Sequence, residues 1–239
     1  MKYNEFEDEM VKELMRMNPE AEVVLEQLDQ DGGMEQELAD FEKVREHLTI
    51  RMVNQEKNRK LLEDVVSIPF LNLSGIFYVA DSLESMMLGV KVTRFLAELW
   101  GVSMETLRET ALENLASSGA FQMREISEVL SEFPEYRIRR GERGKIGLYV
   151  VTDASRTNGP AVLLLPEILD RMAEELGDDL LILPSSVHEL MVLKAADAYI
   201  GDLLRIVREI NASVVSAGEF LADCVYQYSR ERSEVTMVA

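Results

Sequence analysis

The sequence predicts an α+β protein built mostly of antiparallel sheet with packed helices, preceded by a helical N-terminal extension. Three observations support this fold class. The chain has 239 residues, of which 47% are hydrophobic, so it can fill one large core or two small ones. After residue 48, short β-branched and apolar runs alternate with segments of helical periodicity, and turn residues separate them. Before residue 49, apolar side chains recur at helical spacing.

The chain is expected to contain an acidic helical region followed by an α+β domain, which a basic loop divides into two halves. The loop, residues 134–147, contains five Arg or Lys residues and has poor periodicity, as a linker does. The resulting segments are residues 1–48 for the N-terminal region and 49–239 for the α+β domain, with its halves at 49–134 and 147–239.

The N-terminal region has the apolar spacing of three amphipathic helices. Residues 3–17 form the first, and Asn18-Pro19 closes it and opens the second at residues 21–28. Asp31-Gly32-Gly33 is a break, after which the third helix is expected at residues 38–48. These apolar faces are expected to pack on the sheet or on one another.

The first half of the α+β domain contains strand-like and helix-like segments in alternation. Residues 70–80 form the richest aromatic β-type run, and residues 86–92 are expected to pair with it. Ser103 is a suitable N-cap for a helix that continues to residue 115. The other expected elements are a strand at 49–53 and helices at 54–64, 93–99 and 126–133.

Residues 148–193 are the most consistent stretch of the chain, and they predict two antiparallel hairpins flanking one helix. Pro166 fits the first turn of the helix, and Gly177 fits its end. Leu181 lies in an apolar run that is expected to be buried on both faces. The strands are expected at 148–152 and 161–165 in the first hairpin, and at 180–183 and 188–193 in the second, in a sheet shared with residues 70–92.

The C-terminal part predicts one long helix and a last hairpin. Apolar residues recur at helical spacing from residue 200 to residue 210, and Asn211 ends the helix. Residues 224–229 and 235–238 are expected to form the two strands of the hairpin.

The segment LPSSVHE at residues 183–189 is the most specific motif in the chain. Over about residues 41–230, the chain resembles a family of bacterial proteins described only as a domain of unknown function, with an LPSSxHE signature. The resemblance implies a bacterial, cytoplasmic α+β protein without an established activity.

The net charge of −19 is the most unusual number in the composition. Residues 1–50 contain fifteen Asp or Glu against five Lys or Arg. Such a surface repels nucleic acid and anionic membranes and attracts a basic partner, although plain solubility is an alternative explanation. No apolar run is long enough for a membrane span, the start lacks a signal-peptide pattern, and a single cysteine, Cys224, fits the reducing cytoplasm.

The charge favours a non-enzymatic interaction or regulatory protein that binds a basic protein surface. Glu7, Asp8 and Glu13 are the candidate partner-binding residues, because they lie around the apolar face of the first predicted helix. An alternative is a nucleic-acid mimic that inhibits a nucleic-acid-binding enzyme, of the phage counter-defence or anti-CRISPR type. A homo-oligomer is compatible with either, because the basic loop can neutralise acidic residues of another copy.

An enzyme is the third hypothesis, and it depends on the only cluster that combines nucleophile and base types. Ser186 and His188 would share a face of a strand, with Ser185 and Glu189 beside them, as in an unrecognised hydrolase. The sequence identifies neither an orienting acid nor oxyanion donors, so these serines are expected to bond backbone groups at a turn. No catalytic residue, cofactor or metal site is therefore assigned. His47, His188 and Cys224 lack the spacing of a zinc site.

Overall fold

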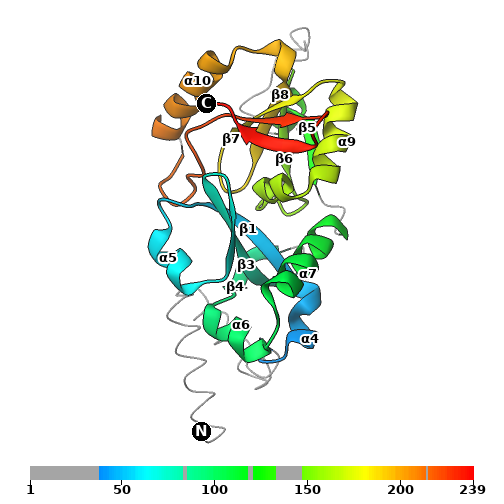
Figure 1. The fold of residues 1–239 in the computed structure, drawn as a ribbon. Coiled ribbons are helices and arrows are strands. Elements are labelled where there is room, and N and C mark those ends of the chain that lie inside the picture. The colour runs from blue at the N-terminus through cyan, green and yellow to red at the C-terminus, as the bar shows by residue number, and fades with distance from the viewer. Residues whose placement is uncertain (1–37, 83–84, 118–120, 133–146, 214) are drawn as a thin grey trace, which may run out of the picture. The chain divides into compact units, whose positions relative to one another are not determined.

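A computed structural model describes residues 38–82, 85–117, 121–132, 147–213 and 215–239 (Figure 1). The chain folds into two compact units. Unit 1 comprises Met1–Phe70 and Ser74–Gly119, and unit 2 comprises Leu71–Leu73 and Ala120–Ala239. Both contain antiparallel sheet and packed helices, which confirms the α+β class. The two helices expected at residues 3–17 and 21–28 lie outside the described residues.

Unit 1 is a four-stranded sheet with short helices against it. The strand order is β1-β3-β2, and β4 pairs with β3. Leu48, Ile50 and Met52 alternate along β1 and are completely buried, as expected for a strand that faces a core. The strands are β1 (Leu48–Asn54), β2 (Ser67–Phe70), β3 (Leu73–Ser82) and β4 (Ser85–Lys91), and the helices are α4 (Phe41–Val44), η1 (Arg45–His47), α5 (Arg59–Asp64), α6 (Arg94–Trp100) and α7 (Met104–Ser117).

Side-chain caps set the start of helices α6 and α7 of unit 1. The Thr93 hydroxyl accepts from the N–H of Leu96 at the start of α6, and the Ser103 hydroxyl accepts from that of Thr106 at the start of α7. In α7, Asn114 donates its amide to the Leu48 carbonyl at 2.8 Å. The helix expected at residues 38–48 therefore ends early, because Leu48 already belongs to β1, on which α7 packs.

Unit 2 is built on a six-stranded antiparallel sheet in the order β10-β9-β7-β8-β6-β5. Its central strand β7 is buried along its whole length. The strands are β5 (Gln122–Glu125), β6 (Leu148–Thr152), β7 (Leu180–Pro184), β8 (Leu190–Lys194), β9 (Tyr226–Ser229) and β10 (Glu234–Met237). The helices are α8 (Ile126–Ser131), η3 (Gly159–Leu164), α9 (Pro166–Leu176), η4 (Ala195–Asp197) and α10 (Ile200–Ser213).

Helices α9 and α10 cover opposite faces of this sheet (Figure 1). On one face, Leu181 of β7 packs in a core cluster with Leu203 and Val207 of α10. On the other face, Tyr228 lies opposite Leu180 in the β7–β9 pairing, and its hydroxyl donates to the Pro166 carbonyl at the start of α9. Burial of β7 on both faces agrees with its uninterrupted apolar sequence.

The expected strand at residues 161–165 is wrong, because residues 159–164 form the 3₁₀ helix η3. Asn158, Gly159 and Pro160 start this helix, and its residues are buried through Leu163. An apolar run that is buried all round does not reveal its period, so a strand and a helix look alike in the sequence. The first predicted hairpin does not exist, since β6 pairs with β5 and β8 instead.

The predicted sheet shared with residues 70–92 is also wrong, because β3 and β4 form part of the separate sheet of unit 1. The second hairpin, β7 with β8, and the last hairpin, β9 with β10, are confirmed. Helix α9 has the predicted limits, and Gly177 ends it with a φ of 77°. The short strands β2 and β5 were not predicted. No described helix combines the length and the apolar composition that crossing a bilayer requires.

Candidate functional site

The turn between β6 and η3 is organised by one buried carboxylate, Asp153, which is 6% exposed. Its Oδ1 accepts from the backbone N–H groups of Thr157 and Asn158, both at 2.8 Å. Its Oδ2 accepts from the Ser155 hydroxyl, which also bonds the Thr157 hydroxyl at 2.6 Å. This is an Asx-type turn, in which a side chain supplies the hydrogen bonds that a regular element would provide.

Gly159 marks a close approach between backbone segments of unit 2. A Cβ atom there would lie 2.5 Å from the Val151 carbonyl oxygen, 2.8 Å from that of His188 and 2.9 Å from the Thr152 Cα. The Gly159 N–H donates to the same His188 carbonyl at 2.9 Å, and the Thr152 hydroxyl donates to it at 3.0 Å. The backbones of β6, η3 and the β7–β8 loop therefore meet here, and only glycine fits. We call this meeting point, with the Asp153 turn, the polar junction.

The structure places Ser186 and His188 in the β7–β8 loop, because β8 begins only at Leu190. The Ser186 hydroxyl accepts from the backbone N–H of His188 at 3.1 Å, as expected of a serine at a turn. The His188 ring lies with Nδ1 3.3 Å from the Thr157 carbonyl oxygen and Nε2 3.6 Å from a carboxylate oxygen of Glu219. The ring is thus oriented by a carbonyl and a carboxylate.

In this arrangement the His188 ring lies beside a carbonyl and a carboxylate and not beside a serine hydroxyl. A serine nucleophile needs a base within hydrogen-bonding reach, about 2.6–3.2 Å from its oxygen. Among the described residues, no hydrogen bond joins the His188 ring to a serine hydroxyl: Ser155 bonds Asp153 and Thr157, and Ser186 bonds backbone. The chemistry of the polar junction is hydrogen bonding that fixes loops.

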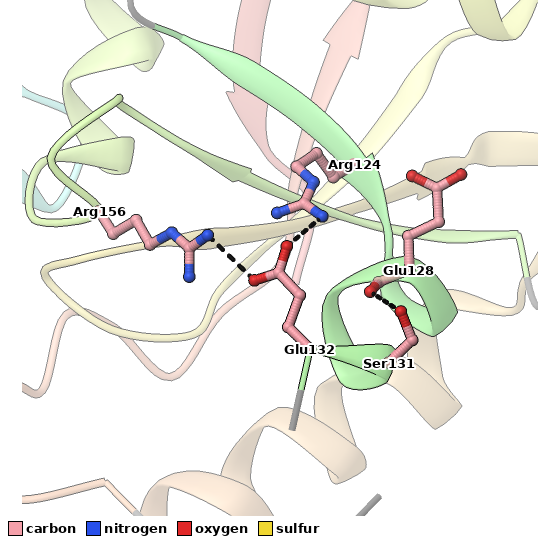
Figure 2. Close-up of polar contacts among 5 residues, drawn as sticks. All are labelled: Arg124, Glu128, Ser131, Glu132 and Arg156. Atoms are coloured by element: carbon pink, nitrogen blue, oxygen red, sulfur yellow. Dashed lines mark hydrogen bonds and ion pairs between the residues drawn. The ribbon is translucent and has the colours of Figure 1, made fainter. Parts of the chain in front are cut away.

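A second polar cluster extends the junction toward the edge strand β5 (Figure 2). One oxygen of Glu132 accepts from Arg124 of β5 at 2.6 Å, and the other accepts from Arg156 of the Asp153 turn at 3.0 Å. These bonds, with that from Arg124 the stronger, hold the pKa of Glu132 below its usual value. Glu132 therefore connects the end of α8, β5 and the turn. This bridge could not be read from the sequence, because Arg124, Glu132 and Arg156 belong to separate elements.

The residues considered for a metal site belong to different units. His47 lies in η1 of unit 1, whereas His188 and Cys224 belong to unit 2. Cys224 is buried, and this burial raises the pKa of its thiol. Within the described ranges, no three or more His, Cys, Asp or Glu side chains gather as metal ligands do.

The described parts of the two units differ in charge. In unit 2, residues 121–132 and 147–239 contain eighteen Asp or Glu against eight Lys or Arg. In unit 1, residues 38–82 and 85–117 contain eleven against nine. Over the described residues the acidic excess therefore lies mostly in unit 2, in addition to the excess that the sequence places in residues 1–50. The candidate residues Glu7, Asp8 and Glu13 lie outside the described residues.

Comparison with known proteins gives one result. A search of curated proteins and a search of solved structures each found no match. Residues 2–230, nearly the whole chain and more than the 41–230 expected, match a family described as a family of unknown function (DUF5688). The chain belongs to this family.

Proposed function

We propose that this protein is a non-enzymatic interaction or regulatory protein whose acidic surface binds a basic protein partner. The charge is the observation that supports the proposal: the whole chain has a net charge of −19, and the described residues of unit 2 hold eighteen acidic against eight basic side chains. Charge of one sign on a folded unit attracts an oppositely charged partner and raises its association rate. The proposal includes a cytoplasmic location, in keeping with the single, buried thiol of Cys224.

The hydrogen bonding of the polar junction also favours binding over catalysis. The side chains that could act as nucleophile or base are bonded to backbone or to one another, so they stabilise loops. Acidic side chains, in contrast, reach solvent on the helices of unit 2. Helix α9 exposes Glu167, Glu174 and Glu175 on the side away from the sheet.

The test is partner capture from host lysate with the intact protein, followed by measurement of association rates with the captured partner. The central variant replaces Glu167, Glu174 and Glu175 by lysine. At about 0.01 M salt the screening length is roughly 30 Å, so these reversals should slow association even if the partner touches another part of unit 2. Raising the salt should weaken the wild-type complex steeply.

The matched control makes the same change on unit 1. Helix α7 exposes Glu105, Glu109 and Glu113 at successive turns, so their reversal alters total charge equally. We expect the α7 variant to keep a faster association than the α9 variant. If the affinity of the captured partner changes neither with salt nor with either set of charge reversals, the acidic surface is not part of the mechanism.

The inhibitor hypothesis is a sharper form of the same proposal, in which the basic partner surface is a nucleic-acid-binding groove. A duplex DNA competitor distinguishes the two. Competition that displaces the captured partner supports a nucleic-acid mimic, and a partner that binds DNA and this protein at once supports ordinary protein docking.

A further inference from the structure

Asn158 and Gly159 form the only Asn-Gly pair in the sequence. Asparagine is a chemically labile residue, and a following glycine makes it most labile, because glycine has no side chain that hinders attack by its own nitrogen. Both residues are buried, and the exposed fraction of Asn158 is 0%. The fold therefore encloses the most reactive asparagine of the chain in the polar junction.

The reaction of an Asn-Gly pair needs no enzyme. The backbone nitrogen of Gly159 forms a bond to Cγ of Asn158 and gives its proton to solvent base. The bond from Cγ to the side-chain nitrogen breaks, and this nitrogen takes a proton from solvent and leaves as ammonia. Water then opens the resulting cyclic imide at either carbonyl, which gives aspartate or isoaspartate at position 158.

The structure holds the pair in a conformation that cannot react. The ψ angle of Asn158 is 30°, which places the Gly159 nitrogen nearly anti to the Asn158 Cβ about the Cα–C bond, whereas ring closure requires these two atoms to be eclipsed. The Gly159 N–H donates to the His188 carbonyl at 2.9 Å, and the Asn158 N–H donates to Asp153 at 2.8 Å. Rotation toward the reactive conformation therefore requires the polar junction to open.

We propose that Asn158 and Gly159 form a self-modification site that reacts only when the polar junction opens, so that opening leaves a lasting covalent change. The rate of reaction is then the rate in an unfolded chain multiplied by the fraction of molecules in which the junction is open. The site is independent of the acidic surface and of any partner.

Each product prevents the polar junction from closing again. In the imide the Gly159 nitrogen has no hydrogen, so the His188 carbonyl loses that donor. Isoaspartate lengthens the backbone by one atom, at a place where even a Cβ on Gly159 would lie 2.5 Å from the Val151 carbonyl oxygen. Aspartate puts a charge at a fully buried position beside the Asp153 carboxylate, and two like charges in a buried site are unfavourable.

The experiment follows the intact protein at mildly alkaline pH by peptide mass spectrometry, with electron-transfer fragmentation to separate aspartate from isoaspartate. In guanidinium chloride, Asn158 should be the first asparagine to react. In the folded protein its amide should persist at least about tenfold longer, because a native state opens only rarely. Equal rates in the folded and the unfolded protein would overturn the proposal.

Variants show whether the polar junction sets the rate. Asp153→Ala removes the acceptor of two backbone N–H groups in its turn, so it should speed the reaction of Asn158 in the folded protein by about tenfold or more. Asp178→Ala is the matched control, because the Asp178 carboxylate also accepts from two backbone N–H groups, those of Asp179 and Ala196. It should change the rate less than about twofold. Circular dichroism confirms that each variant is folded.

Thr152→Val is a second variant, which serves if Asp153→Ala does not fold. It keeps the shape of the side chain and removes one donor to the His188 carbonyl, so it should speed the reaction by about threefold. Protein that has reacted in denaturant and is then refolded should show fast amide exchange in β6 and η3. The proposal is overturned if the junction variants react no faster than Asp178→Ala, or if reacted protein regains native amide protection.

Discussion

Replacing Gly159 by alanine should destabilise unit 2 more than the addition of one methyl group would suggest. The added methyl group would lie 2.5, 2.8 and 2.9 Å from three backbone atoms, of Val151, His188 and Thr152. Backbone atoms cannot rotate away as a flexible side chain can, so the β6 end and the β7–β8 loop must separate. Overpacking of this kind costs about 1–3 kcal/mol.

The separation also strains two hydrogen bonds. The Gly159 N–H and the Thr152 hydroxyl both donate to the His188 carbonyl. Each such bond contributes about 0.5–1.5 kcal/mol. The total loss is then about 2–6 kcal/mol, against roughly 5–15 kcal/mol for a whole domain. At about 2–4 °C for each kcal/mol, the melting temperature should fall by roughly 10 °C.

The measurement is urea unfolding followed by circular dichroism, with amide hydrogen exchange in β6 and β8 to assign the loss to unit 2. Gly218→Ala is the matched control, because a Cβ there meets no atom within 4 Å. It should change the free energy of unfolding by less than about 0.5 kcal/mol. Equal unfolding midpoints for the two variants would refute the close-approach argument.

Four further predictions concern the rest of unit 2. Burial raises the pKa of Tyr226, and burial with the nearby Asp170 raises that of Tyr228 to about 12. The folded state therefore holds the phenol protons more tightly than the unfolded state does. The contribution of the two tyrosines to stability should be complete below about pH 10 and be lost as the pH rises toward about 12. Phenolate absorbance and unfolding measured against pH would check this. Leu181→Asp should cost several kcal/mol, because it puts an unpaired charge in β7, and an unchanged melting temperature would contradict this. The Glu132 carboxyl should titrate below the usual range in NMR, and Arg124→Gln should return its pKa toward that range. By linkage, the stability that Glu132 contributes is present at neutral pH and is lost as the pH falls through the lowered pKa. A fluorophosphonate probe should not label the intact protein, and labelling that Ser186→Ala abolishes would establish a nucleophile.

The candidate site could be read only in part from the sequence. The turn role expected for Ser186 agrees with its bond to the His188 backbone. The orienting partners of His188, Thr157 and Glu219, lie 31 residues before it and 31 after it, and nothing local indicates either. The bridge of Glu132 is hidden for the same reason, because long-range pairs depend on which strands lie side by side.

Local chemistry determined the elements whose limits depend on neighbouring residues. Pro166 and Gly177 fix the two ends of α9, because proline suits the first turn and glycine accepts the positive φ that ends a helix. The period of the apolar residues predicted α10 in the same way, although the helix continues past the expected end at Asn211 to Ser213. These signals act over a few residues, so the sequence alone contains them.

Tertiary structure decided what local chemistry leaves open. Residues 161–165 are apolar at every position, and 161–164 belong to η3 because β6 already has a partner strand on each side. Exposure along α10 was equally hidden: the sequence shows that Leu203, Ile206 and Ile210 are apolar, and only the position of the sheet decides which of them it covers. The physical reason is the same in both cases, since burial depends on segments that are distant in the chain.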